Sequence, residues 1–303
     1  MLDGDFKTII DKFNVISNKG WIKAVNNSLG AIGLTFEHEL NKDPDNDFFP
    51  DFNTVEIKCL GRYSKYPIGL FACSFDGPEE YEISRIAQLY GYYDSMFNDK
   101  KVLYVPLRFN QYSIAKSSYV FKLQYSNDRI YLCVYDINHN LIEKKSFIFI
   151  NTLYQHFMIK LQNLALVRAS KKIIDNTKYF RYYKISLYKL ISFDNFLNLL
   201  MKDIITVNLV CRLSKSGYKI GRYSNQSLVF QIKPCHLNML YNLVYSCENG
   251  ASNISSVVRW YWCNLNFVFI KEVIFNKTYC QFFCLLINVF YFFYNLYYVF
   301  DFF

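Results

Sequence analysis

The sequence predicts an α/β protein with a mixed β-sheet and a second lobe. Segments whose apolar residues recur at helical spacing alternate with short runs rich in β-branched and aromatic residues, and this alternation is typical of the α/β class. Clusters of Asn, Asp and Gly separate the runs, as turns between strands require. At 303 residues the chain is long enough to bury the core of one large domain or of two lobes.

The N-terminal part is predicted to form two helices and a strand. Apolar residues between Phe6 and Ile16 keep helical spacing, so we expect an amphipathic helix that Gly20 closes. A loop punctuated by glycines then leads into a second, short helix. The expected helix, loop, helix and strand lie at residues 3–18, 28–33, 36–40 and 54–60.

The middle of the chain is predicted to contain a helix and an antiparallel meander. The helix is expected at residues 84–93. Four strands are expected after it, at residues 102–107, 119–125, 130–135 and 146–150. Asn127-Asp128 and Asn138-His139-Asn140 are turn signals between the last three strands, so these strands are expected to pair antiparallel.

The second half is predicted to contain two helices, two strands and a β-hairpin. Helical spacing returns in the first helix, and Asp194 is expected to cap the second. Ser216-Gly217 marks the turn of the hairpin. The helices are expected at residues 153–164 and 193–200, the strands at 164–169 and 182–185, and the hairpin strands at 205–212 and 228–233.

The composition indicates a polyanionic partner and a reducing compartment. The chain has 34 Lys and Arg residues against 25 Asp and Glu residues, which gives a formal net charge of +9. Its nine Cys residues are odd in number and scattered, without a Cys-x-x-Cys pair, so neither a zinc site nor a disulfide framework is indicated. Together with the lack of a signal peptide, this favours the cytoplasm.

One short stretch, Asp51 to Lys58, carries the most informative chemistry. Side chains alternate along a strand, so Glu56 and Lys58 should point to one face while Ile57 points into a core. Asp51 lies in the turn that enters the strand and can fold back beside Glu56. Two adjacent carboxylates repel each other, and a hard cation such as Mg²⁺ relieves that repulsion. A neighbouring lysine can position or deprotonate a water and offset charge on a phosphate, so the stretch predicts a metal-dependent phosphodiesterase.

A Glu-x-Lys pattern alone is more often an ordinary half-buried strand, but the surroundings here are informative. With them, the sequence resembles the PD-(D/E)xK nucleases, and within these the MutH-related restriction enzymes of the MvaI/BcnI type. The resemblance extends over about residues 20–244. It is carried by Gly20-Trp21-Ile22-Lys23, Gly33-Leu34-Thr35-Phe36-Glu37, Pro50-Asp51-Phe52 and Val55-Glu56-Ile57-Lys58.

This resemblance implies a PD-(D/E)xK core and a Mg²⁺-dependent type II restriction endonuclease that cuts double-stranded DNA at a specific short site as a monomer. Asp51 and Glu56 would hold the metal, Lys58 would serve the attacking water, and Glu37 would act as a further carboxylate. A DNA methyltransferase encoded nearby is the expected companion. A nicking mismatch-repair endonuclease like MutH would use the same residues and is the alternative function.

The resemblance also implies a division of the chain and a set of DNA contacts. Residues 1–160 are expected to form the catalytic lobe, and residues 161–245 a recognition lobe whose polar β-ribbon can enter the major groove. Family members carry a His-Gly pair and an arginine where this sequence has Gln226-Ser227 and Gln231, which puts the family's C/G-rich target in doubt. The expected DNA-binding residues are Lys23, Arg62, Lys65, Arg212, Arg222, Gln226, Gln231 and Lys233.

The C-terminal tail, residues 246–303, lies outside the resemblance. Residues 278–300 contain no charged side chain and are long enough to span a bilayer, although Asn288 and Asn295 would then lie in hydrocarbon. Three interpretations of the segment are open: coding sequence that runs past its proper end, a buried apolar segment, or a membrane anchor. The first is favoured over the membrane anchor. A membrane-tethered binding protein without catalysis would require a genuine anchor and incidental carboxylates.

Overall fold

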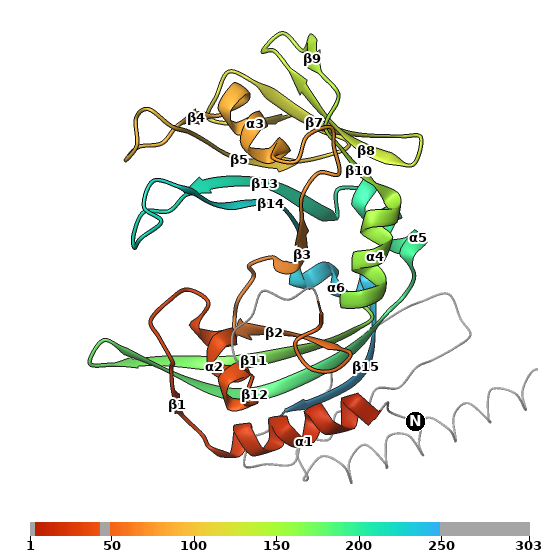
Figure 1. Ribbon diagram of the computed structural model, residues 1–303. Helices are drawn as coiled ribbons and strands as arrows, with labels where there is room; N and C mark the ends of the chain where they lie inside the picture. Colours follow the sequence, from red (N-terminus) through yellow and green to blue (C-terminus); the bar gives the residue numbers. More distant parts are fainter. Residues whose placement is uncertain (1–3, 43–48, 249–303) are drawn as a thin grey trace, which may run out of the picture. The chain divides into compact units, whose positions relative to one another are not determined.

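The computed structural model describes residues 4–42 and 49–248, and its helices and strands confirm the predicted α/β class (Figure 1). The chain divides into two compact units, residues 1–249 and 250–303, and the described residues belong to the first. The helices are α1 (Gly4–Asn18), α2 (Ala31–Glu39), α3 (Glu82–Tyr90), α4 (Ile150–Lys160), α5 (Phe193–Met201) and α6 (Leu237–Leu240), which follows the 3₁₀ turn Pro234–His236.

A five-stranded mixed sheet contains the Glu-x-Lys strand. Its strand order is β1-β12-β11-β2, and β15 also pairs with β12. The pair of β2 and β11 is parallel, whereas the other pairs are antiparallel. The bounds are β1 (Ile22–Lys23), β2 (Val55–Gly61), β11 (Asn163–Ile174), β12 (Thr177–Leu190) and β15 (Tyr241–Glu248).

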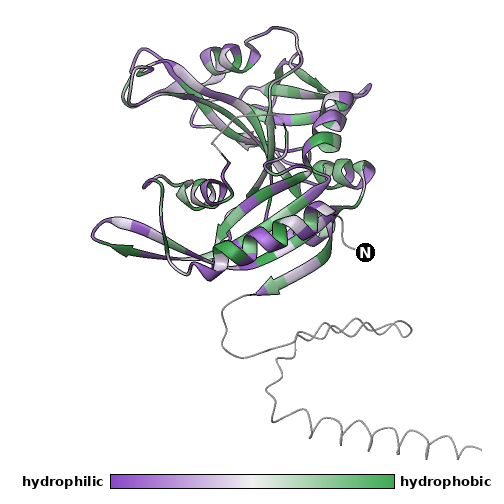
Figure 2. Cartoon of the chain, turned by 60° about the horizontal axis from the view of Figure 1, so that its bottom comes forward, coloured by the Kyte–Doolittle hydropathy of each residue, from purple (hydrophilic) through white to green (hydrophobic). Residues whose placement is uncertain are grey.

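Helices α1 and α2 complete the core of this sheet. Apolar residues of α1, including Phe6 and Phe13, are buried with Ile57 of β2 and Val167 of β11 in one cluster. Figure 2 shows apolar and polar residues alternating along α1, as expected of a helix with one buried face. The Glu-x-Lys strand is therefore held in a packed sheet, which fixes the direction of its side chains.

A second five-stranded sheet, with the order β3-β14-β13-β5-β4, contains the predicted hairpin at its centre. Strands β13 and β14 pair antiparallel, with β5 and β3 on their outer sides (Figure 1). Strand β14 begins earlier than predicted, so the hairpin is longer. The bounds are β3 (Ile68–Cys73), β4 (Tyr92–Tyr93), β5 (Lys101–Leu107), β13 (Ile205–Leu213) and β14 (Tyr223–Ile232).

The third sheet confirms the predicted antiparallel meander. Strand β8 pairs with β7, β10 and β9, and β6 extends the sheet beyond β7. Asn127 and Asp128 both have positive φ, 50° and 55°, in the tight turn between β7 and β8. The bounds are β6 (Ser113–Ile114), β7 (Val120–Ser126), β8 (Arg129–Tyr135), β9 (Leu141–Glu143) and β10 (Phe147–Phe149).

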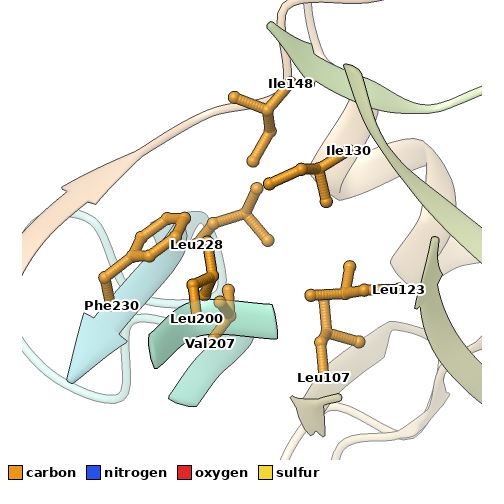
Figure 3. Close-up of a pocket in the computed structure, with 8 residues that line it drawn as sticks. All are labelled: Leu107, Leu123, Ile130, Ile148, Leu200, Val207, Leu228 and Phe230. Atoms are coloured by element: carbon orange, nitrogen blue, oxygen red, sulfur yellow. The ribbon is translucent and has the colours of Figure 1, made fainter. Parts of the chain in front are cut away.

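The hairpin sheet and the meander share one hydrophobic core. Figure 3 shows side chains from both, such as Val207 and Leu228 of the hairpin and Ile130 of β8, pointing toward a cavity of about 10 Å³. Such a cavity is no larger than a water molecule, so the two sheets are tightly packed against each other. One face of the hairpin sheet is thereby covered.

Three further differences from the expectations concern α2, the cap of α5 and a domain boundary. Helix α2 begins at Ala31 and continues through Gly33, where a loop was expected, because a single glycine is tolerated inside a helix that buries Phe36. Ser192, and not Asp194, caps α5, since its hydroxyl accepts a hydrogen bond of 3.1 Å from the backbone N–H of Asn195. Asp194 lies instead in the first helical turn.

The third difference concerns the boundary at residue 160. Strands β11 and β12 belong to the sheet of β2, although they lie within the range expected to form the recognition lobe. The roles assigned to the two ranges remain predictions. The tail after Glu248 lies outside the described residues, and no helix in the described part of the chain is long and apolar enough to cross a membrane.

Candidate active site

A tight turn places Asp51 beside β2. Phe52 and Val55 exchange two backbone hydrogen bonds, of 3.0 and 2.7 Å, and Asn53 between them adopts the left-handed conformation with φ of 49°. The chain thereby folds back on the strand, and the Asp51 carboxylate accepts a hydrogen bond of 2.9 Å from the backbone N–H of Ile57. Asp51 thus lies where the sequence placed it.

Glu56 is almost completely buried, with 2 % of its surface exposed. Burial raises the pKa of its carboxyl group; Lys58 opposes this increase and Asp51 adds to it. The Oε1 atom accepts a hydrogen bond from Lys58 Nζ. Among the described residues, Oε2 is buried and has no hydrogen-bond partner. Such a desolvated carboxylate is typical of a functional site.

Lys58 lies on the same face of β2 as Glu56, and Ile57 points into the core, as the alternation along a strand predicts. Burial by itself lowers the pKa of Lys58, but the carboxylates of Glu56 and Asp51 outweigh this effect and raise it. Lys58 is therefore an ammonium group at neutral pH. It provides a positive charge and N–H donors beside the two carboxylates.

Two lysines that the sequence did not single out also lie beside these carboxylates. Lys42 Nζ is 3.6 Å from Asp51 Oδ1. Lys160 Nζ, at the end of α4, is 3.8 Å from Glu56 Oε2. Lys160 reaches the site only through the folding of a distant segment, and Lys42, nine residues before Asp51, belongs to no motif on which the prediction rests. The surrounding positive charge suits the binding of a phosphate.

Asp5 of α1 holds the turn that positions Asp51, a role that no local sequence pattern indicates. Its Oδ1 accepts a hydrogen bond of 3.1 Å from Asn53 Nδ2, and its Oδ2 one of 2.5 Å from Thr54 Oγ1. These bonds lower the pKa of Asp5. Because the folded-state pKa is lowered, the stabilising effect of the carboxylate is present at neutral pH and is lost as the pH falls through that pKa.

We expect the substitution Asp5→Asn to slow DNA cleavage about tenfold, because outer-shell groups that orient a metal ligand have effects of about this size. The variant should also need more Mg²⁺ for half-maximal rate, since Asp51 would be less firmly placed. Single-turnover cleavage across a Mg²⁺ titration measures both quantities. Asp11→Asn, an exposed substitution on the same helix, is the control. A wild-type Mg²⁺ dependence in Asp5→Asn would contradict this role.

Glu37 lies on α2, and its negative charge acts on Lys58 and on the half-buried Cys59. In the part of the chain that the structure describes, no group of three or more His, Cys, Asp or Glu side chains is arranged to hold a metal ion. The roles of Asp51 and Glu56 as metal ligands, and of Glu37 as a further carboxylate, stay predictions.

The residues present fit a magnesium ion. Glu56 Oε2 is a buried carboxylate oxygen that accepts no hydrogen bond from the described residues, and Asp51 raises the pKa of Glu56, as a repelling neighbour does. Carboxylate oxygens are hard ligands, and Mg²⁺ is commonly held by one or two of them together with water and substrate phosphate. Asp51 and Glu56 can thus hold the ion that the resemblance implies.

The DNA contacts expected near the mixed sheet, which contains β2, are exposed. Lys23 lies on β1, and Arg62 and Lys65 follow β2. The guanidinium of Arg62 lies 5.2 Å from the centroid of the Tyr183 ring. Arg62 is therefore ordered on the surface near β12 and remains a candidate for a phosphate contact.

The DNA contacts expected in the hairpin sheet fall on different faces. Arg212 pairs with Asn225 and points away from the core, and Gln231 shares that face. Gln226 pairs with the buried Cys211, so its side chain points to the covered face. The structure thus brings Arg212 and Gln231 to one surface and does not bring Gln226 there. Arg222 and Lys233 are exposed outside the two strands.

Comparisons with known proteins agree with this geometry. A model of the MvaI/BcnI restriction endonuclease family matches residues 10–241. The structure of the restriction endonuclease MvaI in complex with cognate DNA superposes with a TM-score of 0.75 at 23% identity, covering 80% of this chain and 99% of that one. MvaI in the absence of DNA gives a TM-score of 0.51 at 18% identity, covering 80% and 98%. A search of curated proteins found no match. The structural likeness supports the fold, and the family model covers most of the chain. This chain therefore belongs to the MvaI/BcnI restriction endonuclease family.

Proposed function

We propose that the protein is a Mg²⁺-dependent type II restriction endonuclease that hydrolyses phosphodiester bonds at a specific short site in double-stranded DNA. The observation that carries this proposal is the arrangement of Asp51, Glu56 and Lys58. Lys58 Nζ contacts the buried Glu56 carboxylate, and Asp51 accepts a hydrogen bond from the backbone N–H of the residue between them. Family membership supports the class of reaction. Action as a monomer in the cytoplasm, beside a cognate DNA methyltransferase, belongs to the same proposal.

Each residue of the site has a chemical role in this proposal. Asp51 and Glu56 would hold Mg²⁺, which when bound supplies a Lewis acid and lowers the pKa of a coordinated water. Lys58 donates hydrogen bonds to the attacking water or to a phosphate oxygen and offsets the negative charge that develops there. Lys42 and Lys160 add positive charge around the carboxylates. Asp5 positions Asp51 through the turn.

The test is digestion of unmethylated phage DNA and a supercoiled plasmid with the full chain and MgCl₂, followed by sequencing of the fragment ends. We expect discrete fragments that share a short sequence at their ends, and linear plasmid as the final product. Nicked plasmid alone would favour the MutH-like alternative. Absence of cleavage on either DNA would contradict the proposed function. Light scattering of the full chain bound to one cut site measures whether it acts as a monomer.

A further inference from the structure

The face of the hairpin sheet that points away from the hydrophobic core carries a pair of amide side chains. Asn208 of β13 and Gln231 of β14 lie on interior strands, where the backbone groups are already paired with β5 on one side and β3 on the other. Only side chains can therefore make hydrogen bonds from this face. The opposite face is covered by the hydrophobic core.

The two amides are in direct contact. Asn208 Nδ2 donates a hydrogen bond of 2.9 Å to Gln231 Oε1, across the diagonal between the two strands. This bond limits the rotation of both side chains. In either orientation of the two amide groups, the pair keeps an acceptor oxygen and N–H donors that are not used within it. Among the described residues, no remaining polar atom of the pair is buried without a partner.

Asn208 is buried, with 8 % of its surface exposed, and Gln231 is half-buried, so Gln231 is the member of the pair that a ligand reaches and Asn208 orients it. Asn208 is flanked across the sheet by Pro106 and Val229, which have no side-chain hydrogen-bonding groups. Gln231 lies opposite Gly69 of β3, and a Cβ atom added at Gly69 would meet nothing within 4 Å. A side chain at residue 69 would thus enter open space next to Gln231.

We propose that the Asn208–Gln231 pair reads the major-groove edge of an A·T base pair in the DNA target, an inference that rests on the proposed function. Adenine presents an N7 acceptor and an N6 amino donor, and an amide matches both with one donor and one acceptor. Guanine presents two acceptors, which call for two donors, as arginine provides. An amide oxygen that faces guanine would meet only acceptors, whereas on adenine it meets the N6 amino donor, so the pair favours adenine over guanine.

The experiment selects duplexes from a randomised library with the full chain in EDTA, and then sequences the bound fraction. The wild-type protein should enrich a site with A·T at one fixed position. Gln231→Ala should lose the preference at that position alone, by about 5- to 150-fold in relative affinity. Gln231→Arg should change the preferred pair there to G·C, since the open surface at Gly69 leaves room for the longer side chain.

The control is Gln124→Ala, an exposed strand glutamine in the meander sheet, which should select the wild-type site. Enrichment of G·C at every fixed position, or an unchanged preference in both Gln231 variants, would overturn the inference. A wild-type protein that enriches no sequence would overturn it too. The cleavage assay separates the two proposals, because cutting at a site insensitive to Gln231 leaves the endonuclease proposal standing.

Discussion

Replacing Glu56 by glutamine is expected to reduce the single-turnover rate of DNA cleavage by about 10³-fold or more. A bound metal contributes several kcal/mol to the stabilisation of the transition state, and about 4 kcal/mol corresponds to about 10³-fold in rate. Glutamine keeps the size of the side chain but removes the charge that the ion requires. Asp51→Asn should have a similar effect, because it also removes a negative charge that the ion requires. Its amide oxygen can still accept the hydrogen bond from Ile57, so the turn should be kept.

The substitution Glu56→Gln should leave the fold intact. Because burial raises the pKa of Glu56 in the folded state, its ionised form is disfavoured there relative to the unfolded chain. A neutral amide removes this unfavourable contribution at neutral pH, so the melting temperature of Glu56→Gln in EDTA should equal or exceed that of the wild type. Retained stability together with lost cleavage would separate a functional role from a structural one.

Binding and a matched control complete the measurement. Glu56→Gln should still bind duplex DNA in EDTA, because the exposed basic residues that would contact phosphates are unchanged. Glu39→Gln is the control, since Glu39 lies on α2 and pairs with the exposed Lys19, at 2.6 Å. Its cleavage rate should equal that of the wild type. A near-wild-type rate in Glu56→Gln would show that this carboxylate does not serve the reaction.

Local rules were sufficient to predict the centre of the site. The spacing of two residues in a strand places Glu56 and Lys58 on one face, and the residues after Asp51 form the turn that returns it to β2. The same rule applied to β14 would have separated Gln226 from Gln231. Their positions in the strand differ by five, an odd number, so their side chains point to opposite faces.

The parts that could not be predicted depend on contacts between distant segments. Asp5 reaches Asn53 across 48 residues, and Lys160 reaches Glu56 only because α4 ends beside the mixed sheet. The parallel pairing of β2 with β11 is of the same kind, and it explains why the boundary at residue 160 divides a sheet. Parallel strands need a long connection, and no local pattern identifies which later strand completes the pair.

Replacing Lys58 by methionine is expected to slow cleavage by about 10²- to 10³-fold, the usual effect of removing one donor that stabilises developing charge. Methionine has a similar length and no charge, so the packing around the half-exposed stem of Lys58 should persist. Lys58→Arg should recover part of the rate, because it restores a cation and N–H donors in a different geometry. The single-turnover rate of cleavage at saturating Mg²⁺ is measured for the wild type, Lys58→Met and Lys58→Arg.

Lys160→Met separates the function of Lys58 from a general effect of positive charge. Lys160 lies 3.8 Å from the same carboxylate but does not donate the hydrogen bond that Lys58 Nζ makes to Glu56 Oε1. If Lys58 acts on the reacting atoms and Lys160 acts through Glu56, Lys160→Met should slow cleavage only about tenfold, as outer-shell changes do. Equal losses in the two variants would mean that overall charge is what matters. If the Lys58→Met enzyme were fully active and equally stable, Lys58 would have no role in the reaction, because the variant has no ammonium group at that position.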